Sequence, residues 1–277
     1  MNAWITHSWH DSVTYFNMPV RYFLLWSVLC TFLALLFPSK RSQPILRHGL
    51  ITDIIYYFLL PIYFVRIDAF LKLALIVIVY SSTTRAHLLQ HGLAPLGEIP
   101  YWAQLLMIML MADFMIYWLH RFSHTFPWLW RFHVIHHSST DVDWLSSGRF
   151  HLINAIFQNT TPFAFLLLLG FSPQPLAEVG FLMWLLSIFE HCNLNWTLGP
   201  LRYVIVNPVY HRWHHTYPNE GGNKNFAGFF PFWDIIFGTF YMPKGKTPMV
   251  FGTEHDKVPN GFLGQIAYPF LKAPRIE

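Results

Sequence analysis

Three short stretches, each with two or three closely spaced histidines, constrain this chain more than any other feature of its sequence. On a helix, residues at positions i, i+3 and i+4 share one face, so each stretch can direct its imidazoles into one space. Half of the 16 histidines of the chain fall in these stretches. We call them the first, second and third histidine box: HRFSH with His120 and His124, HVIHH with His133, His136 and His137, and HRWHH with His211, His214 and His215.

The histidine boxes predict a metal site. Packing alone has no use for paired histidines in three places, and burying so many imidazoles without partners is costly. One tetrahedral zinc ion takes three or four protein ligands, so eight imidazoles suit two metal ions that each keep an open position. Imidazole binds iron, zinc and copper, which leaves the metal open. His87 and His91 are also four residues apart, but in a polar loop without a further cluster, and we expect ordinary polar roles for them.

The composition predicts a membrane protein. Of the 277 residues, 54% are hydrophobic and only 12% are charged, which is about half the charged fraction of an average soluble domain. The N-terminal residues lack the basic segment and apolar run of a secretory signal. The basic residues are scattered and the net charge is only +4, so nucleic-acid binding has no support.

Four apolar stretches could form membrane helices. The second contains Pro61 and charged residues, and it could be one kinked span or two short helices. The fourth is broken by Gly170, Pro173 and Pro175, and we interpret it as a helical hairpin that enters the membrane and returns. From Asn193 onward the chain is rich in Gly, Pro and Asn, and we expect it to fold outside the membrane. The four stretches are Val20–Phe37, Ile51–Tyr80, Tyr101–His120 and Ala155–Phe189.

The number of crossings places the histidine boxes on one side of the membrane. Between His137 and His191 the chain makes either two crossings or none, so the residues before and after the hairpin share a side. Arginines flank the boxes, and the positive-inside rule therefore makes this side cytoplasmic. Lys40 and its basic neighbours should lie there too, which requires Ile51–Tyr80 to cross once. The flanking arginines are Arg121, Arg131, Arg149, Arg202 and Arg212.

Together these patterns predict an all-α fold. We expect a multi-pass transmembrane helical bundle with a cytoplasmic helical cap that carries the histidine boxes. The chain should form a single membrane-embedded domain over residues 1–277, with its catalytic core at about 101–243. The membrane could be a bacterial inner membrane or the endoplasmic reticulum, and the oligomeric state is left open.

The ordered motifs between Ala112 and Pro243 resemble those of the fatty acid hydroxylase / sterol desaturase superfamily of integral-membrane di-iron oxygenases. Beside the three boxes, the match includes EHCN with His191, DWLSSGRFH with His151, and the closing pattern NKNFAGFFPFWDIIFGTFYMP. The resemblance implies that the eight box histidines and His191 bind iron. His151 matches a histidine of only some branches, and it could be a ligand, a donor to a ligand or a packing residue. Ser187 stands where the family often has a further histidine.

Three acidic residues are candidates to orient the metal ligands. Asp113 lies on one helical stripe with His120 and His124, and an acid inside a membrane helix is usually functional. We expect Asp113 to orient a box histidine through its ring N–H; the alternative is a salt bridge to a neighbouring arginine. Glu190 and Asp234 are candidates for the same role.

The resemblance implies an oxygenase with two iron ions that uses dioxygen to hydroxylate an unactivated C–H bond of a membrane lipid, such as a fatty acyl chain or a sterol-like lipid. Zinc can replace iron in purified samples, since imidazole sites exchange metals. The chain contains no GxGxxG motif and no cysteine set for an iron–sulfur cluster. We therefore expect an external electron donor: a ferredoxin, a cytochrome or an NAD(P)H-linked reductase.

Other functions have to be weighed against lipid hydroxylation. Desaturation differs only in the fate of the carbon radical and is the nearest enzymatic alternative. A membrane zinc hydrolase would need a general base beside the metal, as in HExxH, and no box contains one. A metal transporter or storage protein would place histidines within several membrane spans, whereas here they cluster at helix ends and in loops.

Overall fold

The computed structural model describes residues 24–271, which form helices joined by loops. None of these described residues belongs to a β-strand, although Pro38 and Leu194 make an isolated bridge. The predicted all-α class is therefore confirmed. The first apolar stretch contains a helix at Leu24–Leu36. Its residues 20–23 and the N-terminal residues that lack a signal pattern lie outside the described residues.

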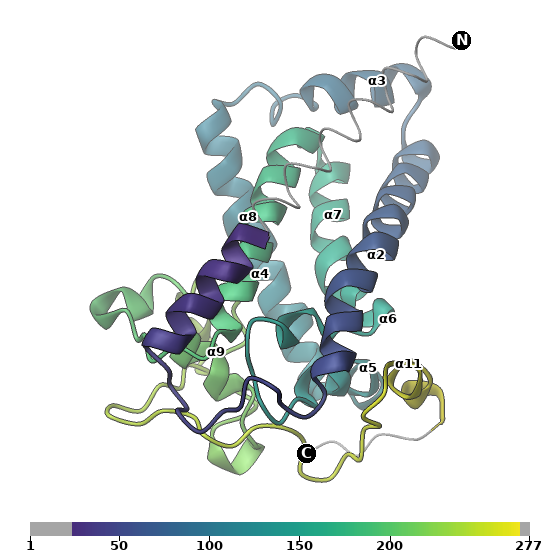
Figure 1. Ribbon diagram of the computed structural model, residues 1–277. Coiled ribbons are helices and arrows are strands. Elements are labelled where there is room, and N and C mark those ends of the chain that lie inside the picture. The colour runs from purple at the N-terminus through teal and green to yellow at the C-terminus, as the bar shows by residue number, and fades with distance from the viewer. Residues whose placement is uncertain (1–23, 272–277) are drawn as a thin grey trace.

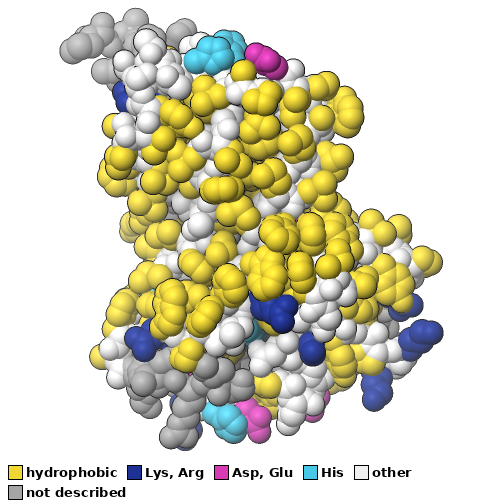
Figure 2. Space-filling model, turned by 180° about the vertical axis from the view of Figure 1, so that it is seen from behind, with side chains coloured by type: hydrophobic (Ala, Val, Ile, Leu, Met, Phe, Trp, Pro, Cys, Tyr) yellow, Lys and Arg dark blue, Asp and Glu magenta, His cyan; other side chains and the backbone are white. Residues whose placement is uncertain are grey.

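The long helices stand side by side in one bundle (Figure 1). Figure 2 shows hydrophobic side chains over most of the bundle surface, with Lys and Arg side chains gathered mostly at its lower end. Two helical segments, Tyr101–Thr125 and Leu152–Leu169, are long and apolar enough to cross a membrane. The bundle consists of the helix Leu24–Leu36, α2 (Leu50–Val79), α4 (Tyr101–Thr125), α7 (Thr161–Leu169) and α8 (Pro173–His191).

The second apolar stretch forms one helix, α2, with Pro61 inside it. The stretch is therefore one helix rather than two short ones, and its crossing of the membrane stays a prediction. Two of the charged residues that interrupt the stretch pair with each other, because Lys72 Nζ lies 2.8 Å from Asp68 Oδ2 one helical turn away. The charges thus find partners on the helix itself and do not end it.

The fourth apolar stretch forms the predicted helical hairpin. Its first arm consists of α6 (Leu152–Ala155), a π-helical turn η2 (Ile156–Thr160) and α7; such turns are frequent at functional sites. Gly170 ends this arm with φ of 115°, a left-handed conformation that favours glycine. The second arm, α8, ends at His191 and returns the chain to the end of the bundle where α4 ends (Figure 1).

The polar segment before α4 is not the loop that the sequence suggested. Residues Ser82–His91 form helix α3, and the Ser81 hydroxyl caps it by accepting from the Thr84 amide at 3.3 Å. This helix has no apolar face, so hydrophobic periodicity could not reveal it. Figure 1 places α3 across the end of the bundle opposite to α5, α9 and α11, and hence far from the three histidine boxes.

The other end of the bundle carries short helices and loops (Figure 1). These include α5, which follows α4 directly, and the Gly- and Pro-rich chain after Asn193. Together they cover the C-terminal end of α4, where the first histidine box lies. The elements are α5 (Pro127–His137), η1 (Ser146–Gly148), η3 (Gly199–Tyr203), α9 (Pro208–His214), η4 (Pro218–Glu220), α10 (Phe232–Ile236) and α11 (Phe262–Leu271).

A buried ion-pair network joins the start of α2 to the loop after α5. Arg47 lies 2.6 Å from both Asp53 and Asp143, and Arg149 lies 2.5 Å from Asp53. Arg212 of the third box is also fully buried. These three arginines hold the fold together, so the positive-inside argument rests on the more exposed basic residues at this end.

Candidate metal centre

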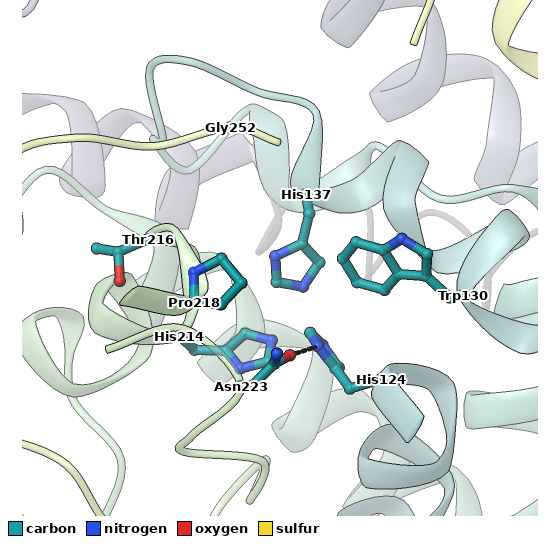
Figure 3. A pocket seen from close by; sticks show the side chains of 8 residues that line it. All are labelled: His124, Trp130, His137, His214, Thr216, Pro218, Asn223 and Gly252. Atoms are coloured by element: carbon teal, nitrogen blue, oxygen red, sulfur yellow. Dashed lines mark hydrogen bonds between the residues drawn. The ribbon is translucent and has the colours of Figure 1, made fainter. Parts of the chain in front are cut away.

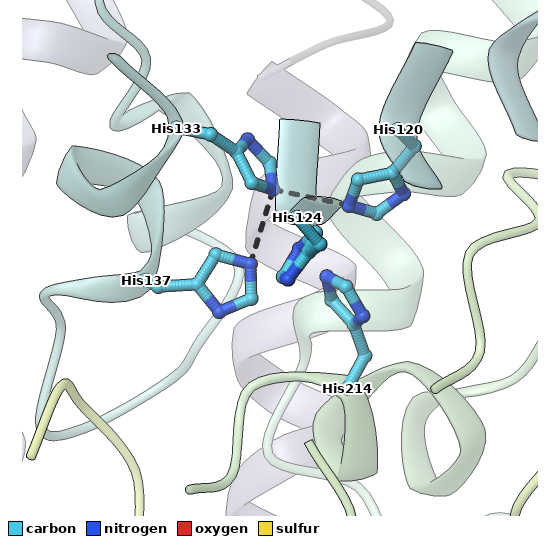
Figure 4. A group of neighbouring side chains, drawn as sticks. All are labelled: His120, His124, His133, His137 and His214. Atoms are coloured by element: carbon cyan, nitrogen blue, oxygen red, sulfur yellow. Dashed lines mark hydrogen bonds between the residues drawn. The ribbon is translucent and has the colours of Figure 1, made fainter. Parts of the chain in front are cut away.

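Nine histidines gather into two groups at the end of α4. In each group, the nitrogen atoms that could bind a metal ion all lie within 4.8 Å of one another, and every member is buried. The members lie on α4, α5, α8 and α9, except His215, which follows the last residue of α9, so four helices converge here. Figure 4 shows the five-histidine group. The five-histidine group is His120, His124, His133, His137 and His214; the four-histidine group is His136, His191, His211 and His215.

The second and third boxes each serve both groups. In the second box, His133 and His137 belong to the five-histidine group, whereas His136 belongs to the four-histidine group. Residues three and four apart share a helix face but differ in direction by a fraction of a turn, which is enough to separate them. The two groups are neighbours, because the rings of His137 and His215 stack with their centroids 4.5 Å apart.

Hydrogen bonds fix the ring orientation of four members of the five-histidine group. In each, Nδ1 lies within 2.9 Å of a carbonyl oxygen. A carbonyl oxygen can only accept, so Nδ1 carries the proton and Nε2 presents its lone pair. The bonds run from His120 to the Phe226 carbonyl (2.9 Å), from His124 to the Asn223 side chain (2.8 Å), from His133 to the Asn154 side chain (2.8 Å) and from His214 to the Lys224 carbonyl (2.7 Å).

The lone pairs defined in this way point at one another. His120 Nε2 lies 3.1 Å from His133 Nε2, although both nitrogens are acceptors. In the four-histidine group, His191 donates through Nδ1 to the Ser187 carbonyl at 2.6 Å. Its Nε2 lies 3.0–3.2 Å from Nε2 of the other three members. Facing lone pairs repel unless a cation lies between them.

Both groups therefore fit a metal ion. Metal–nitrogen bonds of about 2.0–2.1 Å would place neighbouring ligand nitrogens about 3.0–3.4 Å apart at angles between square and tetrahedral. The observed separations fall at this spacing. In addition, Nε2 of His124 and of His214 is buried and has no hydrogen-bond partner, which a metal ion would supply.

Burial keeps these histidines neutral. It lowers the pKa of the members on α5 and at α9 well below the ordinary value of 6.5, because the charged imidazolium loses its hydration. Neighbouring histidines lower the pKa further. Metal ions bind the neutral imidazole, so the groups are ready to bind at neutral pH. The members concerned are His133, His136, His137, His214 and His215.

Segment 223–230 orients the five-histidine group. Within four residues it supplies three of the four oxygens that accept from ring Nδ1–H groups. The Asn225 side chain fixes the segment by accepting from the Tyr241 amide at 2.7 Å and donating to the Tyr210 carbonyl at 2.8 Å. Backbone carbonyls carry no sequence signal, so this role was missed. Asn154, which accepts from His133, did have a sequence signal, because it is a polar side chain beside an apolar stretch.

Asp113 and Asp234 bind this segment rather than a histidine. Asp113 accepts from the amides of residues 228, 229 and 230 at 2.8–3.1 Å. Asp234 accepts from the amides of residues 226 and 227 at 2.8 and 2.9 Å, and also from the Tyr210 hydroxyl. The predicted histidine–carboxylate bond and the alternative salt bridge of Asp113 were both wrong. The two acids contact the histidines only indirectly, because they bind the segment whose Phe226 carbonyl orients His120.

Glu190 lies against the four-histidine group. Its Oε1 is 3.6 Å from His211 Nδ1, and the side chain is buried. Its other oxygen has no hydrogen-bond partner. A distance of 3.6 Å is too long for a hydrogen bond, and His211 Nδ1 has no hydrogen-bond partner. That Glu190 orients this histidine stays a prediction.

His151 lies outside both groups. Its Nδ1 accepts from the Ile153 amide at 3.2 Å and caps α6, while its Nε2 lies 3.3 Å from the Ile266 carbonyl of α11. Of the possible roles of His151, the geometry matches packing and capping. The preceding residue is closer to the centre, since the ring of Phe150 lies 4.2 Å from that of His136.

A small pocket reaches the five-histidine group. His124, His137 and His214 line its inner wall, and Trp130 and Asn223 line its sides (Figure 3). The pocket holds about 10 Å³, which is room for one water molecule or a molecule of similar size. A small co-substrate can therefore reach this group.

Residues 105–239 match the family model described as fatty acid hydroxylase. The matched region holds all nine histidines of the two groups. The chain carries a fatty acid hydroxylase domain. The superfamily predicted from the ordered motifs is thus confirmed.

Relatives of this fatty acid hydroxylase domain are lipid-modifying oxidoreductases by name. The chain is 35% identical to ornithine lipid hydroxylase OlsE of Rhizobium tropici over 63% of its own length and 52% of that protein. It is 34% identical to human alkylglycerol monooxygenase over 52% of its length and 32% of that protein. It therefore matches about half of the first relative and a third of the second. No solved structure matches the chain. The two apolar helices and these lipid enzymes indicate a membrane protein.

Proposed function

We propose that the chain hydroxylates a C–H bond of a membrane lipid, with dioxygen as co-substrate and two iron ions held by the two histidine groups. The observation that carries this proposal is the pair of adjacent, buried groups whose imidazole lone pairs converge. The hydroxylases and monooxygenases among its relatives support the reaction class, and their names support a lipid substrate.

The protein's own part in this reaction is to hold and shield the metal ions. When bound, the two iron ions would supply the activation of dioxygen, which amino acid side chains cannot provide. The histidines would hold them with neutral nitrogens, and the oxygens of residues 154, 223, 224 and 226 would keep four of the rings in place. Burial of all nine rings leaves room for little water beside them, which limits side reactions of a reactive oxidant.

We further propose that the protein is multi-pass and that its histidine end faces the cytoplasm. The helices of the bundle run between the layer of α3 and the layer of α5 and α9, and their outward side chains are largely apolar (Figures 1 and 2). The chain enters the histidine end before α2 and returns to it after α4 and α8, in agreement with an even number of crossings. The exposed basic residues of this end fit the positive-inside rule.

The electrons for dioxygen reduction should come from a separate protein of the ferredoxin, cytochrome or NAD(P)H-reductase class. The sequence contains neither a GxGxxG motif nor a cysteine set for an iron–sulfur cluster. Pure protein given NADH alone should therefore turn over very little, and addition of a reductase system should start the reaction.

Reconstitution with labelled dioxygen tests the proposal. The purified protein is loaded with ferrous iron without oxygen, mixed with a membrane lipid extract and a reductase system, and exposed to isotopically labelled dioxygen. We expect a lipid that gains one labelled oxygen atom. Loss of two hydrogens without oxygen gain would show desaturation instead. Full lipid-modifying activity with zinc alone and without dioxygen would contradict the proposal. A variant in which the exposed His91 is replaced, His91→Ala, serves as the control for histidine removal.

A further inference from the structure

Trp130 lies directly against the five-histidine group. Its ring centroid is 5.0 Å from that of His124, 5.4 Å from that of His137 and 6.1 Å from that of His133. Figure 3 shows the indole beside His137 and His124 in the pocket. Among the described residues, no other tryptophan and no tyrosine has a ring contact with a histidine of either group.

A carboxylate joins this indole to a tyrosine. The Trp130 N–H donates to Asp256 Oδ2 at 2.9 Å, and the Tyr268 hydroxyl donates to Asp256 Oδ1 at 2.9 Å. All three side chains are buried, with 5%, 8% and 6% of their surface exposed. Tyr268 lies on α11, whose Leu263, at 79% exposed, reaches the surface of the protein. The three residues thus form a continuous path from the five-histidine group to the outermost helix of this end.

The chemistry of this path is that of one-electron transfer. Tryptophan and tyrosine are the side chains that most readily give up one electron without a bound cofactor. An oxidised indole or phenol becomes a strong acid, so its oxidation needs a base in hydrogen-bond contact. Asp256 offers one carboxylate oxygen to each. Packing alone would be served by any apolar side chain in place of these three polar ones.

We propose that Trp130, Asp256 and Tyr268 form a redox relay that draws oxidising equivalents away from the five-histidine group when no lipid C–H bond is in place. This inference rests on the proposed oxygenase function, because the oxidant is the one that the metal centre forms with dioxygen. The relay would protect the ligands, since the indole of Trp130 lies against the rings of His124 and His137.

The relay consists of two electron transfers within the protein and a third from an external reductant. In the first, the indole of Trp130 gives one electron to the oxidant, and its N–H proton passes to Asp256 Oδ2, which leaves a neutral indolyl radical. In the second, the phenol of Tyr268 gives one electron to this radical and its O–H proton to Asp256 Oδ1, while the proton on Oδ2 returns to the indole nitrogen. Trp130 is restored, Asp256 is protonated and Tyr268 is a phenoxyl radical. A soluble one-electron reductant of the thiol or ascorbate class then restores Tyr268, with the proton from Asp256.

The relay is tested in the absence of lipid. Iron-loaded full-length protein in detergent, with its reductase system, is exposed to dioxygen and frozen at intervals, and electron paramagnetic resonance records protein radicals. Dioxygen uptake is measured in parallel, and peptide mapping locates oxidised side chains. In the wild type we expect a tyrosyl signal. Tyr268→Phe should shift the radical to a tryptophan, and Trp130→Phe should abolish both signals and raise oxidation of the histidine ligands several-fold. Trp102→Phe, at an exposed tryptophan of α4, is the matched control.

The outcomes separate this inference from the function on which it rests. No dioxygen uptake in the wild type would contradict the proposed function itself. Uptake without any radical or oxidised residue at Trp130 and Tyr268 would overturn the relay alone. Unchanged radical signals in Trp130→Phe would also overturn it. A purely structural role for Trp130 would lower the melting temperature without moving the radical between residues, and Tyr268→Phe, which keeps the Trp130–Asp256 bond, covers the case in which Trp130→Phe does not fold.

Discussion

The two histidine groups are built from the same boxes but are held in different ways. In the five-histidine group, uncharged oxygens accept from the ring Nδ1–H groups, and three of these oxygens come from the four residues 223–226. In the four-histidine group, a carboxylate, Glu190, lies beside His211, and the Ser187 carbonyl accepts from His191. Nδ1 of His136, of His211 and of His215 is buried without a hydrogen-bond partner.

The two histidine groups are therefore not equivalent in the partners that surround their rings. A carboxylate beside a ligand makes the imidazole a stronger donor, whereas neutral oxygens mainly fix its orientation. We therefore expect an electron-rich four-histidine site and a geometrically rigid five-histidine site. The pocket is lined by His124, His137 and His214 of the five-histidine group and by no member of the four-histidine group.

Removal of one ligand from each group should have the largest effect. His214→Ala takes a ligand from the five-histidine group and His136→Ala takes one from the four-histidine group. Both variants should lose lipid hydroxylation to below detection, because two metal ions are needed together. Each should keep one of the two metal ions, which elemental analysis of the purified protein would show. Full activity in either variant would contradict the claim that both groups are needed for lipid hydroxylation. His91→Ala on α3 provides the control.

Loss of one oxygen that orients a histidine ring should lower the metal affinity of the five-histidine group alone. Asn223→Ala removes the side chain that accepts from His124 Nδ1. We expect metal affinity at this group to fall by about 10–100-fold, the usual cost of losing such a partner. A titration with cobalt, followed by absorption spectroscopy, would measure it. Equal weakening of both groups would argue against separate supports, and the exposed Asn195→Ala is the matched control.

Neutralising the carboxylate should weaken the other group by a smaller factor. Glu190→Gln keeps the size of the side chain beside His211 but removes its charge. The affinity of the four-histidine group for metal should fall by about 10-fold, at the lower end of such effects. The same cobalt titration applies. A loss at the five-histidine group would contradict the assignment, and Glu178→Gln, at an exposed position of the same helix, tests for a general effect of charge.

The smallest effect is expected at His151. Its side chain caps α6 and lies in neither group. His151→Ala should keep both metal ions and lower the free energy of unfolding by about 0.5–2 kcal/mol, the usual cost of losing a cap. Thermal unfolding and metal analysis of the same sample would check both points. Loss of a metal ion would reinstate His151 as a ligand.

The sequence predicted the large features of the fold because they depend on local patterns. Apolar stretches predicted the bundle, and Gly170 marked the turn of the hairpin. The spacing of the boxes predicted that their imidazoles converge, because helix geometry alone sets which residues share a face. Helix α3 was missed, since its ten residues have no apolar face.

The finer structure of the site could not be predicted in this way. The second and third boxes are each divided between two groups, which depends on how α5 packs against α4 and α9 packs against α8 rather than on spacing. The carbonyls of Lys224 and Phe226 accept from histidines, but every residue has a carbonyl, so nothing in the sequence marks these two. Asp113 was recognisable from the sequence as an acid within an apolar helix, but its partner was not. Its carboxylate accepts from three backbone amides of residues 228–230 and not from a histidine ring.

The most direct test of the account is Mössbauer spectroscopy of the full-length protein loaded anaerobically with isotopically enriched ferrous iron. Two groups with different ligand numbers and different surroundings should give two quadrupole doublets of equal area, with two iron ions per chain. His214→Ala and His136→Ala should each remove a different doublet. A single doublet from one iron ion per chain, or the loss of the same doublet in both variants, would contradict a centre made of two distinct sites.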